Sequence, residues 1–215
     1  MFNNSTEIVG VILSGGLSRR MGNRDKSSLQ LADKPLFEHV LDRFSPQCNS
    51  VIISSNSHNE QLSSYQLPII KDSLEGFLGP LAGLLASMEW VQKHQPDTQW
   101  IATVPVDTPF LPTNLVASLY QSIHDNHSTI ACAASNKRTH PVIGLWPVKL
   151  LSDLRLALTE KDIRKIDLWT SHYKVSHPDF SYKTIDPFFN INCHEDLIEA
   201  EVLYDKLKRK NNLPI

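Results

Sequence analysis

The chain has 215 residues, of which 41% are hydrophobic and 20% are charged, and its formal net charge at pH 7 is -2. This composition is that of an ordinary globular protein, and the near-neutral charge argues against a general nucleic-acid binder or a protein of anionic membrane surfaces. The first residues carry no basic and apolar leader, and no apolar run approaches the length of a membrane span. We therefore expect a cytoplasmic protein without nucleic-acid or membrane partners.

The cysteines and histidines form no pattern of metal or disulfide chemistry. Cys48, Cys132 and Cys193 lie far apart, are odd in number and contain no C-x-x-C pair. Free thiols in a reducing compartment are therefore expected rather than a disulfide framework or a zinc site. Histidines such as His39 and His94 lack ligand spacing, so we expect them to pack or to face solvent.

Apolar runs and helical spacing alternate along the whole chain. Apolar runs predict strands at residues 8–13, 51–53, 68–70, 100–104, 129–134 and 142–146. Helical spacing predicts helices at about 35–44, 80–94, 112–126, 148–159 and 194–210. Strands separated by helices predict a three-layer α/β/α architecture with a mostly parallel central sheet. Because no linker or internal repeat interrupts the pattern, we expect one domain over residues 1–215.

A glycine-rich, basic loop follows the first strand. Its sequence from Leu13 to Lys26 is L-S-G-G-L-S-R-R-M-G-N-R-D-K. Gly15 and Gly16 let a ligand approach the backbone closely, and exposed N–H groups together with Arg20 and Lys26 would bind phosphates. The spacing fits neither a P-loop nor a dinucleotide fingerprint. A glycine turn with solvated arginines is the alternative, but the whole string directly after a buried strand favours a nucleotide loop.

A carboxylate follows the strand predicted at 100–104, in the sequence T-V-P-V-D-T-P-F that contains Asp107. Magnesium is usually held by one or two carboxylates together with substrate phosphates. An aspartate two residues before Pro109 also fits a simple turn. Because a phosphate loop is expected at the same edge of the sheet, we favour Asp107 as a magnesium ligand.

Three further segments lie where strands end or helices begin. Ser54 and Asn56 close the second strand, Asp72 follows the third, and the G-P-L-A-G run ending at Gly83 opens a helix. Ser54 and Asn56 also fit ordinary turns. Gly83 could admit either a ligand or a packed strand, and both interpretations stay open.

The second half carries weaker signals. His140 precedes a strand, Arg164 belongs to a basic pair, and the alternation of Asn190 and Asn192 would place both on one face of a strand. Solvent-exposed positions, or an Asx turn before the last helix, explain these residues equally well.

The string L-x-G-G-x-S-x-R-M-G-x-x-D-K resembles the signature loop of nucleotidyltransferases, and more closely that of the molybdenum cofactor guanylyltransferase family. The elements D-x(6)-G-P-L-A-G, D-x-P-F, H-P-x-[IV] and F-x-N-[IV]-N are also similar to that family, so the resemblance extends from about residue 8 to residue 196. It implies a Rossmann-like nucleotidyltransferase fold whose N-terminal half binds the nucleotide and whose C-terminal half binds the acceptor.

The resemblance also implies roles for individual residues. The nucleotide would be bound by Leu13, Ser14, Gly15, Gly16, Lys26, Ser54, Asn56, Asp72, Gly83 and Asp107. The acceptor would be bound by His140, Arg164, Asn190 and Asn192. Lys26, Arg20 and Asp107 would carry catalysis, with Mg²⁺ at Asp107. One position that is often asparagine in the family is Ser54 here, which leaves the base contact open between Ser54 and Asn56.

The activity implied is transfer of GMP from GTP to the terminal phosphate of molybdopterin or its molybdenum-loaded form. A phosphate monoester has a second pKa of about 6 and needs no strong general base, which agrees with the lack of a clear His–Asp or Ser–His set. Cofactor-delivery and molybdoenzyme-maturation proteins are further expected partners. The alternatives are a cytidylyl- or sugar-phosphate nucleotidyltransferase, which would share much of the site, and a catalytically silent GTP-binding module.

Overall fold

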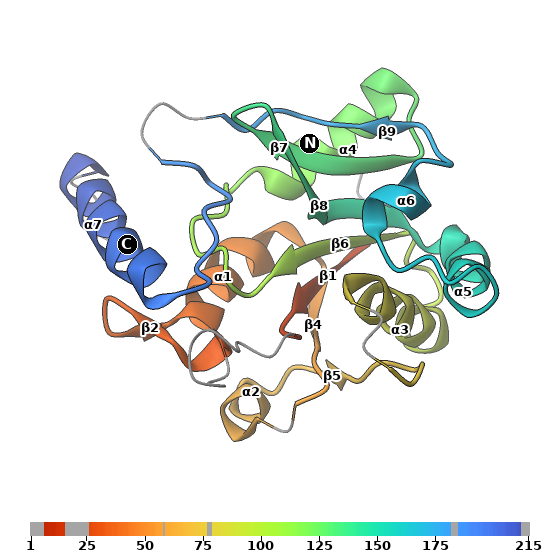
Figure 1. Ribbon diagram of the computed structural model, residues 1–215, viewed down its shortest axis with the longest axis horizontal. Helices are drawn as coiled ribbons and strands as arrows, with labels where there is room; N and C mark the ends of the chain where they lie inside the picture. Colours follow the sequence, from red (N-terminus) through yellow and green to blue (C-terminus); the bar gives the residue numbers. More distant parts are fainter. Residues whose placement is uncertain (1–6, 16–25, 58, 77–78, 182–184, 212–215) are drawn as a thin grey trace.

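A seven-stranded sheet forms the centre of the protein (Figure 1). The computed structural model describes residues 7–15, 26–57, 59–76, 79–181 and 185–211, with the backbone alone for residues 26 and 209–211. The strands of this sheet are β1 (Ile8–Leu13), β4 (Ser50–Ser54), β5 (Ile69–Ile70), β6 (Trp100–Pro105), β7 (Ile130–Ser135), β8 (Arg138–Pro147) and β9 (Val175–Ser176). Their spatial order is β5-β4-β1-β6-β8-β7-β9. Neighbours are parallel except where β8 pairs with β6 and β7, which confirms the mostly parallel sheet.

Helices cover both faces of this sheet. One face is covered by α1 (Leu36–Phe44) and α4 (Leu115–Asn126), and the other by α3 (Pro80–His94), α5 (Leu151–Thr159) and α6 (Ile166–Thr170). Along β1, Ile12 packs in the first core, whereas Val9 and Val11 pack in the second. This alternation explains why β1 is apolar throughout, since a strand buried on both faces has no polar side. The expected three-layer α/β/α fold is therefore confirmed.

Short elements and the end of the chain depart from the expected pattern. Periodicity did not predict α2 (Glu60–Ser64), the hairpin of β2 (Gln30–Leu31) and β3 (Lys34–Pro35), or the 3₁₀ turns η2 (Lys26–Ser28) and η3 (Ser45–Gln47). The first turn of the helix expected at 148–159 is a 3₁₀ turn, η4 (Val148–Leu150), and α5 follows it. α6 and β9 were also missed, because such segments are too short for a period to register. β8 begins four residues earlier than expected, after a two-residue turn whose Asn136 and Lys137 have φ of 48° and 63°. That conformation suits a tight hairpin between β7 and β8.

The prediction of a strand that carries Asn190 and Asn192 is wrong. Residues 185–193 have no regular structure and lead into α7 (His194–Asn211). The amide of Ile191 binds the carbonyl of Asp107, and the amide of Asn192 binds the carboxylate of Asp196. Because these amides are bound to a turn and to a side chain, they form no strand ladder.

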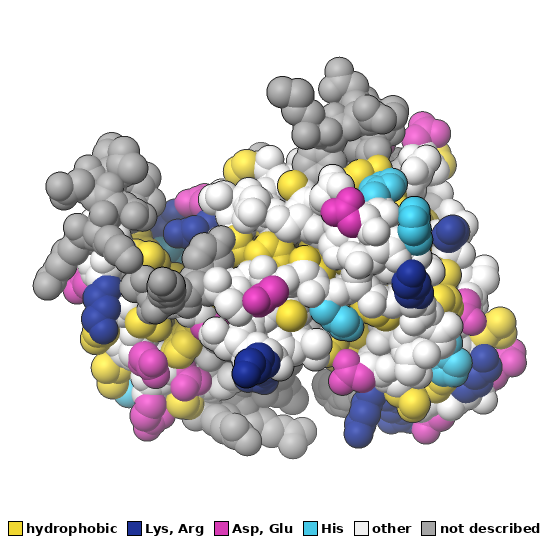
Figure 2. All heavy atoms as spheres, turned by 90° about the horizontal axis from the view of Figure 1, so that it is seen from above, with side chains coloured by type: hydrophobic (Ala, Val, Ile, Leu, Met, Phe, Trp, Pro, Cys, Tyr) yellow, Lys and Arg dark blue, Asp and Glu magenta, His cyan; other side chains and the backbone are white. Residues whose placement is uncertain are grey.

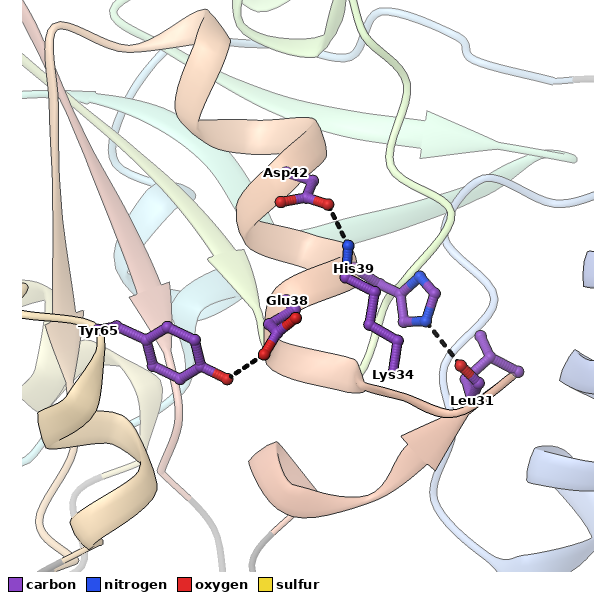
Figure 3. A network of polar contacts seen from close by, with 6 residues as sticks. All are labelled: Leu31, Lys34, Glu38, His39, Asp42 and Tyr65. Atoms are coloured by element: carbon purple, nitrogen blue, oxygen red, sulfur yellow. Dashed lines mark hydrogen bonds and ion pairs between the residues drawn. The ribbon is translucent and has the colours of Figure 1, made fainter. Parts of the chain in front are cut away.

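The β2–β3 hairpin is tied to α1 by polar contacts (Figure 3). His39 on α1 donates from Nε2 to the carbonyl of Leu31 at 2.8 Å, and its ring lies edge-on to Tyr204 of α7 at 5.3 Å. Burial lowers the pKa of His39 below its ordinary value. Lys34 on β3 pairs with Asp42 on α1. His39 is therefore a packing residue, as expected.

The described part of the molecule has mixed surface charge and free thiols. On the face drawn in Figure 2, acidic and basic side chains are interspersed. The three cysteines are unpaired, and burial raises the pKa of both Cys48 and Cys132 to about 12. Of the helices in the described part of the chain, none is long and apolar enough to cross a membrane.

Candidate functional site

The ends of β1, β4 and β6 are joined by main-chain hydrogen bonds. The amide of Ser14 donates to the carbonyl of Ser54 at 2.9 Å, and the amide of Val106 donates to the carbonyl of Leu13 at 3.1 Å. Gly15 follows, is exposed, and a Cβ on it would meet no atom of the described residues within 4 Å. The loop predicted to bind phosphates therefore starts from a fixed backbone.

Ser14 has an unusual hydroxyl. The residue is only 7% exposed, and its Oγ has no hydrogen-bond partner among the described residues. A buried hydroxyl without a partner costs about 1–3 kcal/mol, so such groups in native proteins call for a specific explanation. A polar atom of a bound ligand would satisfy this hydroxyl, which supports the predicted role of Ser14.

The C-terminal end of the glycine-rich loop, after Lys26, is held against α2. Gly16 and Arg20 lie outside the described residues, as does the side chain of Lys26. The backbone after Lys26 forms the η2 turn, in which Ser27 is 1% exposed and accepts a hydrogen bond from Asn59 Nδ2 at 3.0 Å. Asn59 also caps α2 by accepting from the amide of Gln61 at 2.9 Å. The chain just after Lys26 is thereby held against α2.

Asn56 and Asp72 form a reciprocal pair next to β4 and β5. Asn56 Nδ2 donates to Asp72 Oδ2 at 2.7 Å, and the amide of Asp72 donates to Asn56 Oδ1 at 2.8 Å. Asn56 is exposed, whereas Ser54 is only 5% exposed. The structure thus brings Asn56 and Asp72 together, and of the two candidates for a base contact Asn56 is the accessible one.

Gly83 lies where α3 crosses the ends of β1 and β4. A Cβ at this position would come within 2.5 Å of Ser54 Oγ and 3.2 Å of Leu13 Cδ2. The missing side chain lets the helix approach the strands closely. This geometry favours the packing interpretation of Gly83 over a direct ligand contact.

Asp107 follows β6 and is only 8% exposed. Its Oδ1 accepts a hydrogen bond from Asn190 Nδ2 at 2.9 Å, and its carbonyl accepts from the amide of Ile191 at 3.0 Å. The preceding residue, Val106, is bonded to Leu13. The Asp107 carboxylate is therefore fixed beside the start of the loop.

The described side chains fit a magnesium ion that is bound together with the phosphates of the substrate. Among the described residues, no group of three or more His, Cys, Asp or Glu side chains could hold a metal ion. Magnesium needs no such cage, because one or two carboxylates suffice when substrate phosphates and water supply the other oxygens. Asp107 fits the part of that single carboxylate.

His140 on β8 belongs to a chain of polar side chains that the sequence did not reveal. Its Nε2 lies 2.8 Å from Ser135 Oγ, and Ser135 Oγ lies 2.8 Å from Asp186 Oδ1. Phe188 packs against the His140 ring with the centroids 4.8 Å apart. Burial lowers the pKa of His140, Asp186 acts to raise it and Arg138 to lower it. The only sequence signals were that Ser135 precedes a tight turn and that Asp186 precedes Asn190 by four residues.

The other residues predicted to bind the acceptor substrate do not all lie together. The segment with Asp186 and Asn190 joins His140 to Asp107, while the amide of Asn192 binds Asp196 near the start of α7. Arg164 is exposed, pairs with Asp162 at 2.7 Å, and has its carbonyl 3.8 Å from the Cβ position of Gly79 before α3. The described contacts therefore connect His140 and Asn190 but place Arg164 beside α3.

Comparisons with known proteins cover most of the chain. The pattern of the MobA-like NTP transferase domain matches residues 10–173. Molybdenum cofactor guanylyltransferase of Rhodopseudomonas palustris (strain BisB5) is 44% identical over 191 residues, which are 89% of this chain and 91% of that protein. The protein of the same name from Bradyrhizobium sp. (strain ORS 278) is 44% identical over 201 residues, 94% of this chain and 95% of that protein. The crystal structure of molybdopterin-guanine dinucleotide biosynthesis protein A from Archaeoglobus fulgidus aligns with a TM-score of 0.73 at 25% identity, covering 93% of this chain and 99% of that one.

Proposed function

Because the chain belongs to the MobA-like NTP transferase family, we propose that it transfers GMP from GTP to the terminal phosphate of molybdopterin. An oxygen of that phosphate forms a bond to the α-phosphorus of GTP, the bond from the α-phosphorus to the bridging oxygen breaks, and pyrophosphate leaves. The products are a guanine dinucleotide cofactor and pyrophosphate. The names of the relatives support an enzyme of this type.

The observation that carries this proposal is the position of Asp107. The Val106–Leu13 hydrogen bond of 3.1 Å holds its backbone beside the start of the glycine loop, and Asn190 holds its carboxylate from the other side. The Asp107 carboxylate is thus fixed between the segments predicted to bind nucleotide and acceptor. This is where charge on a transferred phosphoryl group has to be stabilised.

The residues of the chain then divide the work by position. Gly15 offers its backbone and Ser14 its unsatisfied hydroxyl to the nucleotide, while main-chain bonds to Val106 and Ser54 hold Leu13 and Ser14 in place. Lys26 and Arg20 neutralise phosphate oxygens. Because the acceptor phosphate is largely ionised near neutral pH, with a second pKa of about 6, no side chain has to remove a proton from it. Catalysis on this account consists of positioning and charge stabilisation.

Asp107 would hold Mg²⁺ together with phosphate oxygens, with Asn190 orienting the carboxylate. When bound, Mg²⁺ neutralises negative charge on the phosphates. The exposed Asn56–Asp72 pair stands beside the strand end that contacts Ser14, where it fits contacts to base and ribose. The three unpaired thiols fit a reducing, cytoplasmic setting. Delivery and maturation partners stay predictions from the resemblance.

The test is pyrophosphate release by the purified protein with GTP, molybdopterin and magnesium. We expect release that requires all three and is abolished by chelation, with a product whose mass equals that of molybdopterin plus GMP less water. An incubation without acceptor is the control. Binding of GTP with no release in the complete mixture would instead identify a binding module.

A further inference from the structure

The chain Asp186–Ser135–His140 determines the protonation pattern of the imidazole. The carboxylate of Asp186 accepts from the amide of Phe188 at 2.9 Å and from the hydroxyl of Ser135 at 2.8 Å. A serine hydroxyl has one proton, and here it is donated to Asp186. Ser135 Oγ must then accept in its 2.8 Å contact with His140, so Nε2 of His140 carries the proton. In the neutral ring, Nδ1 is therefore left as an acceptor.

The β7–β8 hairpin makes this contact local and rigid. Ser135 pairs with Arg138 and Ala133 pairs with His140, so the side chains of Ser135 and His140 are diagonal neighbours on one face of the hairpin. Ser135 is completely buried, which shields its hydroxyl from competing water. Phe188 covers one side of the ring. The hydrogen bond with Ser135 and the packed ring of Phe188 thus fix the orientation of His140.

The sheet register places His140 at the same edge as Asp107. β6 and β8 are antiparallel with Thr103 opposite Gly144, so His140, which precedes Gly144 on β8, lies toward the end of β6 that Asp107 follows. A bulge interrupts the ladder between β7 and β8 next to His140, and bulges of this kind commonly redirect side chains beside active sites. No described residue forms a hydrogen bond with His140 Nδ1. That nitrogen can therefore accept a hydrogen bond from a ligand.

We propose that Ser135 and Asp186 are positioning residues that hold His140 as the Nε2–H tautomer, so that Nδ1 accepts a hydrogen bond from an N–H group of the acceptor's pterin ring. This inference rests on the proposed function, since it takes the acceptor from it. It assigns to Ser135 and Asp186 a role that the sequence did not suggest. In this role His140 is a neutral side chain that recognises the pterin ring, and not a cation that binds a phosphate.

The groups around the ring favour the neutral form that this role needs. Burial is the largest influence on the His140 pKa and lowers it, and Arg138 on the same strand acts in that direction. Asp186, from the segment before α7, is the described group that acts in the other direction. A neutral ring accepts at Nδ1, whereas a phosphate would need the protonated ring.

The first test reads the tautomer in the full-length protein without any acceptor. Nitrogen-15 to proton long-range spectra at about pH 8, above the usual histidine pKa of about 6.5, distinguish the two neutral tautomers. The His140→Asn variant assigns the signal. We expect the Nε2–H tautomer in the wild-type protein and a mixture of tautomers in Ser135→Ala. A wild-type ring protonated at Nδ1 alone would overturn the proposal.

The second test separates recognition of the acceptor from a general effect on folding. We expect Ser135→Ala to raise the KM for molybdopterin about three- to tenfold, as for one weakened hydrogen bond, and to leave the KM for GTP within about twofold. Ser135→Thr, which keeps the hydroxyl, should recover most of the loss. Thr139→Ala, an exposed neighbour on the other face of the hairpin, is the matched control.

The outcomes distinguish this inference from the function on which it rests. Transfer by the wild-type protein with an unchanged molybdopterin KM in Ser135→Ala would overturn the role of the chain and leave the activity in place. Equal rises in both KM values would contradict acceptor recognition as well. Absence of transfer in the wild-type protein would contradict the proposed function, while the tautomer measurement would still test the positioning of His140.

Discussion

The two sides of the candidate site are built by different means. On the nucleotide side, parallel strands end together, and main-chain hydrogen bonds such as Ser14–Ser54 hold their ends. On the acceptor side, residues 185–193 have no regular structure, and side chains such as Asp186 and Asn190 hold them. Regular backbone tolerates side-chain changes, whereas an irregular segment depends on individual hydrogen bonds. Substitutions should therefore act locally on the first side and spread along the second.

Asp107 belongs to both sides, so its loss should have the largest effect. Asp107→Asn keeps the shape of the side chain and an oxygen for Asn190 but removes the charge. We expect turnover to fall at least about 100-fold, the scale seen when one group that stabilises transition-state charge is removed. Thermal unfolding should stay close to that of the wild-type protein.

The matched control for Asp107 is Asp125→Asn, since Asp125 is an exposed aspartate of α4 that accepts from Gln121. It should turn over normally. If Asp107→Asn also kept near-normal turnover with magnesium, Asp107 would not link the nucleotide and acceptor sides of the site. It would then be a residue that only forms a turn.

Lys26 tests whether charge matters on the nucleotide side beyond the backbone. Lys26→Ala should lose about one to two decades in GTP affinity or turnover, the scale of one charged hydrogen bond of about 1.5–3 kcal/mol. Lys26→Gln should not restore the loss, because its amide carries no charge. Lys34→Ala is the control, since Lys34 pairs with Asp42 on the surface (Figure 3). Equal effects of the two alanine variants would make Lys26 an ordinary loop residue.

Asn190 tests whether the irregular segment transmits an effect to the other side. Asn190→Ala removes the hydrogen bond to the Asp107 carboxylate, so we expect kcat/KM to fall about tenfold. Affinity for GTP alone, measured by calorimetry without acceptor, should change less. Asn114→Ala removes an exposed asparagine at the start of α4 and should be silent. A normal kcat/KM in Asn190→Ala would show that Asp107 needs no support from this segment.

Two glycines on the nucleotide side should have the smallest and most separable effects. Gly15 lies outside the left-handed region, and the methyl group added by Gly15→Ala would meet no atom of the described residues within 4 Å, so Tm should move by no more than about 2 °C. The KM for GTP should nevertheless rise about tenfold if a ligand runs past that backbone.

Gly83→Ala should show the reverse pattern. The added Cβ meets Ser54 Oγ, so Tm should fall by about 2–4 °C for a strain of about 1 kcal/mol, and adding Ser54→Ala should recover it. An unchanged Tm in Gly83→Ala would mean that the helix yields easily and that packing does not explain this glycine.

The sequence predicted the regular nucleotide side of the site better than the irregular acceptor side. β1, α3 and the other long elements were predicted within a few residues, because burial on one or both faces leaves a local apolar pattern. The positions of Leu13 and Asp107 at one sheet edge followed from the parallel topology. The hydrogen bonds from Ser135 to Asp186 and from Asn190 to Asp107 join residues 51 and 83 positions apart. No local pattern encodes such contacts, which is why an irregular segment was mistaken for a strand.

The nucleotide side of the site is expected to select guanine, and the acceptor side to complete transfer of the nucleotide. The most direct measurement offers equal amounts of GTP, CTP and ATP with molybdopterin and magnesium, and reads the nucleotide of the product by mass. Guanine has an N1–H and a 2-amino group that adenine lacks, and a site built to bind them leaves buried polar groups unpaired with another base. We expect the guanylyl product to exceed the others by more than about tenfold. A predominantly cytidylyl product would contradict the guanylyl assignment while leaving the protein a nucleotidyltransferase.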